Sequence, residues 1–246
     1  MIRQLRSETA KVTTTTTTVG LLAALAGLVV LAVVVHVYAL PDDQLANGDS
    51  QRQLLTDIGI NLGGLFAALI GALSVTTEFR TGTIRPTVLA SPRRARVIAA
   101  KAVVSAGAGA LAVLVSVGTA SVAARVTLSV RDLASTPSAG DYVELLAGGA
   151  VAGGLLGVIG TAVGAIIRAQ VPTFVALFIW LLFIENVLVE LPGVHRFVPG
   201  ALAQGIAGQS REGVLQDIWL AALVLCAYAL GALFFSVDAT RRRDIA

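Results

Sequence analysis

The chain has 246 residues, of which 56% are hydrophobic and 13% are charged, and its mean hydropathy is +0.83. A soluble fold of this size needs more charge to cover its surface, so the composition excludes a soluble globular protein and indicates apolar surface facing lipid. The net charge of +3 is small for a nucleic-acid-binding protein, and we expect no nucleic-acid partner. The single cysteine, Cys226, excludes an intramolecular disulfide.

Six apolar stretches are predicted to span a membrane as helices, because a span needs about 20 apolar residues and an isolated strand cannot satisfy its backbone in lipid. Before them, residues 1–18 are predicted to form an interfacial segment. Its threonine run is expected to bond its hydroxyls to preceding carbonyl oxygens where the chain turns into the membrane. The predicted spans, of which the second is the shortest, are Val19–Leu40, Ile58–Thr76, Ile98–Ala124, Tyr142–Ile167, Thr173–Leu191 and Ile218–Val237.

The predicted fold class is an all-α integral membrane protein in which residues 1–246 form a single transmembrane domain. Residues 77–97 form a cytoplasmic loop between the second and third spans. Residues 192–217 form an outer loop between the fifth and sixth spans. Its apolar piece is too short to cross and contains Pro199, so we expect an outer re-entrant element there.

The basic residues predict the orientation, because cytoplasmic segments of membrane proteins carry an excess of Lys and Arg. With the N-terminus and the C-terminus both inside, 13 of the 18 basic residues are cytoplasmic and five are outside. The five on the outer side are Arg52, Arg125, Arg131, Arg196 and Arg211.

Glycines at four-residue spacing mark the second and fourth spans as sites of close helix packing, because small residues let helix backbones approach each other in lipid. Packing within one chain is favoured over a seam between two copies. The glycines concerned are Gly59 and Gly63 in the second span, and Gly149, Gly153, Gly157, Gly160 and Gly164 in the fourth.

Signals of enzymatic chemistry are scarce. The two histidines, His36 and His195, lie in different segments, and no Gly-x-Ser-x-Gly sequence is present. Neither lysine, Lys11 or Lys101, belongs to a Gly-Lys-Ser/Thr phosphate-binding loop. We therefore expect no catalytic residues, no metal and no cofactor, and any ATP must be bound by another polypeptide.

Polar residues inside the predicted spans are candidates for lining a transport pathway, because they are costly in lipid. They are Asn61 in the second span and Glu185 with Asn186 in the fifth. Glu185 fits equally a hydrogen bond between helices and a lining role. A proton relay needs several such groups along one face, which disfavours a proton-driven carrier.

The cytoplasmic loop carries the most specific pattern. Glu78 is followed by Phe79 and Arg80, then by Gly-Thr, and Ser-Pro-Arg-Arg precedes the third span. In these features the chain resembles the permease subunits of ABC-2-type (export-type) ABC transporters, with Ser7–Lys11 and a fifth span bearing Trp180 and Glu185 also similar to that family. The matching loop positions are Glu78, Gly82, Thr83, Pro92, Arg94 and Lys101.

The resemblance implies a permease homodimer or heterodimer in the bacterial cytoplasmic membrane, driven by a separate ATPase subunit, that exports an amphipathic, lipid-like or drug-like substrate. Phe79 is then expected to anchor the ATPase, and Gly82 to end a short helix. Glu78 either pairs with the ATPase or caps the loop locally. The residues implied in coupling are Glu78, Phe79, Arg80, Thr81, Gly82, Thr83 and Arg85.

Two functions of other classes fit the same topology. One is a membrane structural or sensory subunit without transport, whose basic loop binds a cytoplasmic partner or anionic lipid. The other is an autonomous secondary carrier. A neighbouring gene encoding a soluble ATPase with a phosphate-binding loop favours the ATP-driven transporter over both.

Overall fold

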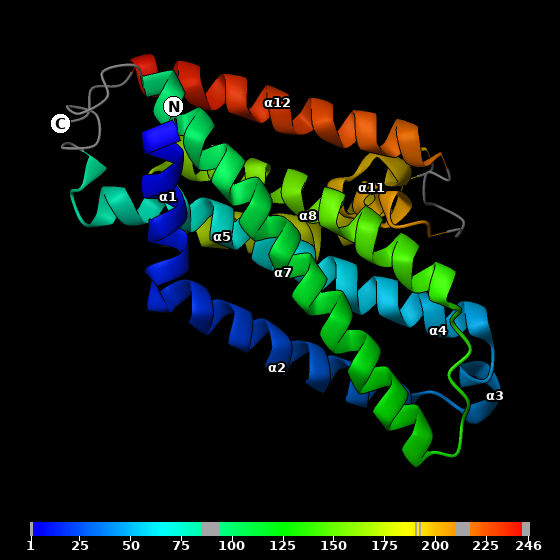
Figure 1. The fold of residues 1–246 in the computed structure, drawn as a ribbon. Coiled ribbons are helices and arrows are strands. Elements are labelled where there is room, and N and C mark those ends of the chain that lie inside the picture. The colour runs from blue at the N-terminus through cyan, green and yellow to red at the C-terminus, as the bar shows by residue number, and fades with distance from the viewer. Residues whose placement is uncertain (1, 85–93, 190, 192, 210–216, 243–246) are drawn as a thin grey trace.

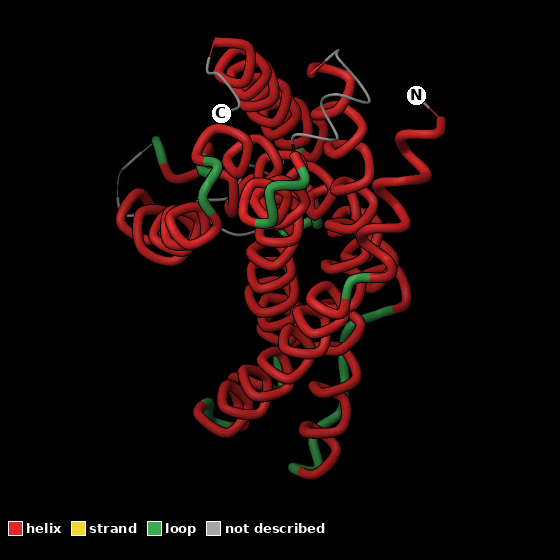
Figure 2. The backbone as a smooth tube through the Cα atoms, turned by 90° about the vertical axis from the view of Figure 1, so that its left-hand side faces the viewer, coloured by secondary structure: helices red, strands yellow, loops and turns green. Residues whose placement is uncertain are grey.

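The computed structural model describes residues 2–84, 94–189, 191, 193–209 and 217–242. Within these residues the chain is almost entirely helical and has no strand (Figures 1 and 2). The elements in chain order are α1 (Ile2–Thr14), α2 (Thr16–Ala39), α3 (Asp42–Leu45), α4 (Gly48–Leu54), η1 (Leu55–Ile60), α5 (Asn61–Arg80), α7 (Arg94–Val130), α8 (Ala139–Ile167), α9 (Gln170–Phe178), η2 (Ile179–Ile184), α10 (Glu185–Val189), η3 (His195–Phe197), α11 (Pro199–Ile206) and α12 (Ile218–Arg242).

Among the described residues, five helices are long and apolar enough to cross a membrane, which fits the expected α-helical, multi-pass membrane protein. They contain five of the six predicted spans. The predicted first, fourth and sixth spans coincide closely with α2, α8 and α12. The predicted third span lies within α7, which is 37 residues long and extends beyond the apolar stretch at both ends.

The predicted second span was expected to be the shortest, and this is wrong. It belongs to a continuous helical segment, Gly48–Arg80, which has 33 residues and is the most buried of the five. The segment comprises α4, the π-helical turn η1 and α5. Its first turns are polar, and their side chains bond to other segments; Gln51 Nε2, for example, donates to the carbonyl oxygens of Leu45 (2.8 Å) and Ala134 (3.0 Å).

The predicted fifth span is represented by three consecutive helical segments. These are α9, the π-helical turn η2 and α10, of 9, 6 and 5 residues. Its longest apolar helical stretch, Gln170–Ile184, is shorter than the five long helices. In the predicted outer loop, α11 occupies the place of the expected re-entrant element, and its side chains Leu202, Ala203 and Ile206 are buried.

The core lies where α5, α7 and α8 pack against each other at close range (Figure 1). A Cβ atom at Gly71 of α5 would lie 2.0 Å from the carbonyl oxygen of Gly157 in α8. A Cβ at Gly160 would lie 1.9 Å from the carbonyl oxygen of Ala68. Only glycine permits these approaches, so the fourth span's glycines pack within one chain, as the favoured interpretation predicted.

Residues 2–14 of the predicted interfacial segment form a helix of their own, α1. In Figure 1, α1 runs across the ends of the other helices, and α2 starts at a bend. The bend lies at Thr15, whose backbone is extended. As expected, the hydroxyls of Thr13 and Thr14 donate to the carbonyl oxygens of Thr9 (3.0 Å) and Ala10 (2.6 Å).

The bundle has two ends, which we call the α1 end and the α11 end. The start of α1 and the end of α12 lie at the α1 end, which faces the viewer in Figure 2. At the α11 end lie α3, α4 and α11 (Figure 1). The outermost helices, α2 and α12, expose large apolar side chains such as Leu31, Leu223 and Phe234, which fits contact with lipid.

Candidate functional site

Four charged side chains meet at the α1 end and form what we call the four-charge cluster. It consists of Glu8, Lys11, Glu78 and Lys101. Lys101 Nζ donates to Glu8 Oε2 and to Glu78 Oε1, both at 2.7 Å. Lys11 Nζ donates to Glu8 Oε1 (2.8 Å) and to Glu78 Oε1 (2.6 Å). Each lysine therefore bridges the same two carboxylates.

Three of the four side chains are buried, Lys11 being the exception, and the charges of the cluster balance. Lys101 is 1% exposed, Glu8 3% and Glu78 6%. A third hydrogen bond runs from Lys101 Nζ to the carbonyl oxygen of Ser74 at 2.8 Å, so the ammonium group has three partners. Removing charges from water is costly, and the cost is offset only where each charge has close opposite charges and hydrogen bonds. Both lysines and Glu8 meet that requirement, whereas Glu78 accepts both of its bonds at Oε1 and its Oε2 is buried without a hydrogen-bond partner.

Lys11 is the more exposed lysine of the cluster and lies outside the predicted spans. Partial burial lowers its pKa, but hydrogen bonds and charge attraction from Glu78 and Glu8 outweigh this effect. The net result is a pKa above the ordinary value of 10.5. The two carboxylates thus stabilise the ammonium form of Lys11.

The cluster joins three elements that are distant in sequence. Glu8 and Lys11 come from α1, Glu78 from the last turn of α5, and Lys101 from the second turn of α7. These contacts fix α1 to the two core helices that flank the predicted cytoplasmic loop. Any displacement of the end of α5 must therefore move α1 and α7 or break ion pairs.

The predicted coupling segment begins in a different context from the one expected. The sequence placed Glu78 and Phe79 in a separate short helix of the loop, but α5 continues through both to Arg80. The sequence also left Glu78 between a partner contact and a local role. Its carboxylate bonds to Lys11 and Lys101, so the structure shows a contact within the chain, and a contact of Glu78 with a partner protein stays a prediction.

Phe79 is half-buried rather than fully presented to solvent. The guanidinium carbon of Arg168 lies 5.4 Å from the centre of its ring, a cation–π geometry. Arg168 also donates to the carbonyl oxygen of Ala239 near the end of α12 (3.2 Å). The ring therefore presents part of its surface at the α1 end, beside the turn between α8 and α9.

Beyond Phe79 the chain forms an exposed turn, Arg80–Thr83, which we call the 80–83 turn. Gly82 has a φ of 70°, the left-handed conformation with which glycine ends helices, and this confirms its predicted role, here at the end of α5. The hydroxyls of Thr81 and Thr83 are 2.9 Å apart. Arg85, the last predicted coupling residue, lies outside the described residues.

Sequence reasoning did not identify the cluster as a unit. Glu78 and Lys101 were noted for their match to a loop pattern, and Glu8 and Lys11 only as parts of Ser7–Lys11. A usable signal was present, since two acids and two lysines lie at the ends of apolar stretches near one face of the membrane. Their pairing required the fold, because Glu8 and Lys101 are 93 residues apart.

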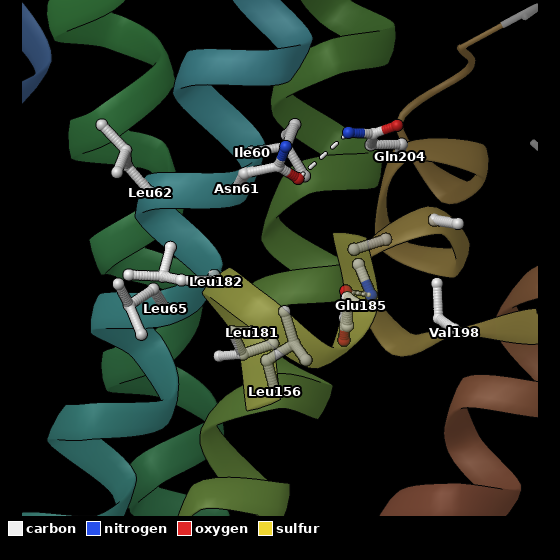
Figure 3. A pocket seen from close by; sticks show the side chains of 14 residues that line it. Ile60, Asn61, Leu62, Leu65, Leu156, Leu181, Leu182, Glu185, Val198 and Gln204 are labelled. Carbon is white, nitrogen blue, oxygen red and sulfur yellow. Dashed lines mark hydrogen bonds between the residues drawn. The ribbon is translucent and has the colours of Figure 1, made fainter. Parts of the chain in front are cut away.

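A second group of predicted residues meets at a pocket between α5, α10 and α11, which we call the Glu185 pocket (Figure 3). Its volume is about 180 Å³. Asn61 and Glu185, both predicted to line a pathway, lie on its wall, and the side chain of Asn186 is outside the described residues. Gln204 Nε2 donates to Asn61 Oδ1 at 3.1 Å, and Figure 3 shows this bond.

Glu185 combines the two roles that the sequence left open. Its Oε1 accepts a hydrogen bond from Trp180 Nε1 at 3.1 Å, and its Oε2 accepts one from the backbone N–H of Gly200 at 2.9 Å. The carboxylate thus holds the first turn of α11 against α10, while the side chain also lines the pocket. Glu185 is 7% exposed.

Comparison with known proteins assigns no family. No protein-family model matches the chain, and no curated protein matches its sequence. Within the described residues, no group of three or more His, Cys, Asp or Glu side chains has a geometry suited to a metal ion. The function must therefore be inferred from the chain's own residues.

Proposed function

We propose that the chain is the permease subunit of an ATP-driven exporter that moves an amphipathic, lipid-like or drug-like substrate outward with a separate ATPase subunit. The proposed topology has six spans with both termini in the cytoplasm, so the α1 end is cytoplasmic and the α11 end faces outward. The fifth span is then the segment Gln170–Val189, which includes the π-helical turn η2. The permease functions as a dimer in the bacterial cytoplasmic membrane.

The observation that supports this proposal most strongly is how the 80–83 turn is attached to the helix bundle. The turn is exposed, yet it begins two residues after Glu78, whose carboxylate is held by two lysines from other helices. A load on the turn is therefore transmitted to α1 and α7 through ion pairs and to α8 through close packing. A loop that serves only to orient the chain by its positive charges does not need buried ion pairs that connect it to two other helices.

Transport in this scheme is a two-state equilibrium that ATP biases through the partner. Closure of the ATPase displaces the 80–83 turn, and the rigid group of α1, α5 and α7 moves with it. That movement changes access to the Glu185 pocket from the cytoplasmic or the outer side. The chain supplies the pathway and the 80–83 turn that receives the movement, and the partner binds the nucleotide.

Co-purification tests the proposal. A tagged copy of the chain is purified from membranes together with a soluble ATPase encoded beside it, and the bound ATPase is quantified. Arg80→Glu should reduce binding about 30-fold, since loss of an interface hot spot costs about 2 kcal/mol. Arg196→Glu makes the same charge change at the α11 end and should not change binding. Equal retention of ATPase by both variants contradicts the proposal and favours a non-transporting subunit or a secondary carrier.

A further inference from the structure

The Glu185 pocket has a chemical character that selects one class of ligand. Most of its wall is aliphatic, with Leu62, Leu65, Leu156 and Leu182 among the lining side chains. Glu185 is the only charged residue among the fourteen that line it. Among the described residues of the pocket wall there is no lysine, arginine or histidine, so this carboxylate faces an apolar space without a cation.

The two hydrogen bonds to Glu185 leave room for a third partner. Both donors, the Trp180 indole and the Gly200 amide, are neutral. A carboxylate has about four acceptor positions, so two donors do not exhaust it. A buried carboxylate without an opposite charge is costly in an apolar site, and an incoming cation removes that cost.

The polar rim of the pocket also offers acceptors. The Nε2 of Gln204 donates hydrogen bonds to Asn61 Oδ1 (3.1 Å) and to Asp57 Oδ1 (3.2 Å), so its donor group is already engaged. The polar side of the pocket therefore favours ligands that carry N–H donors and a positive charge.

We propose that the Glu185 pocket binds organic ammonium ions that carry an apolar group, with the ammonium at the Glu185 carboxylate and the apolar group against the leucines. As a statement about the exported substrate, this rests on the proposed function and narrows it to cationic amphiphiles. The volume of about 180 Å³ is below the roughly 300–1,000 Å³ of sites for drug-sized ligands. The pocket therefore encloses the ammonium group and the adjoining part of the apolar group.

The chain provides its own reporter for a binding experiment. It has two tryptophans, and one of them, Trp180, bonds directly to Glu185. Trp219 is 85% exposed, so Trp219→Phe leaves Trp180 as the single tryptophan, whose emission is excited selectively over that of tyrosine. Hexylamine, hexanol and hexanoate are titrated into the purified chain in detergent, without any ATPase, at a mildly alkaline pH at which hexylamine is still cationic.

Hexylamine should change Trp180 fluorescence saturably and bind about tenfold or more tightly than hexanol, because it alone offers a charged donor to the carboxylate. Hexanoate should not bind. Glu185→Gln retains an oxygen for the Gly200 amide and should reduce hexylamine affinity to that of hexanol. Asp43→Asn removes an acidic charge from an exposed position and should leave the affinity unchanged.

A second variant keeps the charge but displaces it. A Cβ atom at Gly200 would lie 2.2 Å from Glu185 Oε2, so Gly200→Ala should force the carboxylate aside and weaken hexylamine binding. Equal affinities for hexylamine and hexanol, or an unchanged affinity in Glu185→Gln, overturn the inference. The binding assay contains no ATPase, so its result is independent of the ATPase experiments. If hexylamine binds but the chain does not couple to an ATPase, only the proposed function is contradicted. If the chain couples to an ATPase but does not bind hexylamine, only this inference is contradicted.

Discussion

Replacing Lys101 by methionine should strongly destabilise the protein. Methionine matches the length of the lysine stem but removes an ammonium group that is 1% exposed and has three hydrogen-bond partners at 2.7–2.8 Å. The variant leaves Glu8 and Glu78 buried with a single counter-charge, Lys11. Breaking a buried ion pair on one side costs about 3–5 kcal/mol, because the remaining charge is uncompensated.

The expected effect can be measured as a shift of the thermal unfolding midpoint of the purified chain in detergent, at a fixed heating rate. For a chain of this size, each kcal/mol corresponds to roughly 2–4 °C, so Lys101→Met should lower the midpoint by roughly 6–20 °C. Arg96→Met is the matched control. It lies on the same helix but is exposed, and surface substitutions usually change stability by about 0.5 kcal/mol or less.

A double variant separates charge imbalance from lost packing. Adding Glu8→Met to Lys101→Met removes one charge of each sign and leaves the Lys11–Glu78 pair, whose atoms are 2.6 Å apart. The second substitution should therefore recover about 1–3 kcal/mol. If Lys101→Met unfolds at the same temperature as Arg96→Met, or if the double variant is simply additive, the cluster is not a coupled, buried unit.

Three further outcomes are expected. Gly71→Ala should lower the unfolding midpoint by an amount equivalent to about 1–3 kcal/mol, because its Cβ would lie 2.0 Å from a backbone carbonyl oxygen. Gly20→Ala is the control and should not lower it, because the space around Gly20 is open. Equal midpoints for the two variants refute the packing model. In a cysteine-free background, Asp49→Cys should react with an impermeant thiol reagent added outside and Thr83→Cys should not, and the reverse pattern refutes the topology. Stability contributed by Lys11 should be complete below pH 10.5 and be lost as the pH rises through its raised folded-state pKa, so alkaline melting curves should lose this component in Lys11→Met.

Much of the fold could be predicted because hydropathy and length report directly on helices that face lipid. The limits of α2 and α8 differ from the predicted spans by only a few residues. The glycine spacing in α8 also had a local physical meaning, since a missing side chain is what permits close packing. Properties that depend on one segment at a time were therefore accessible from the sequence.

The start of the second span was not accessible, for a physical reason. Hydropathy falls before Ile58 because residues such as Gln51 and Arg52 are polar. In the structure, Arg52 bonds to Asp141 (2.7 Å) and Glu144 (2.6 Å) of α8, so the helix continues through polar residues that other segments satisfy. Such compensation between distant segments is invisible in a hydropathy pattern.

The candidate sites show the same limit. Asn61 and Glu185 were singled out because polar groups are rare in spans, and they line one pocket. One of the two hydrogen-bond partners of Glu185, the backbone amide of Gly200, carries no side-chain signal at all. Glu78 was identified as important, but its engagement by Lys11 and Lys101 depends on how α1 crosses the bundle, which local sequence does not specify.

The internal role of Glu78 changes which substitutions test coupling. Glu78→Arg would place a third positive charge in the four-charge cluster and damage the fold itself. The exposed 80–83 turn is the appropriate target, because its side chains can change without disturbing the cluster. Arg80 is the first residue of that turn.

The rate of ATP hydrolysis in lipid vesicles is the most direct test of the central claim, that this chain is driven by a separate ATPase through the 80–83 turn. The partner ATPase is reconstituted with wild type, with Arg80→Glu or with Arg196→Glu at equal protein. Wild type and Arg196→Glu should stimulate hydrolysis above the rate of the ATPase alone, and Arg80→Glu should lose most of that stimulation. Hydrolysis that is unaffected by the chain, or equally stimulated by all three forms, contradicts the claim.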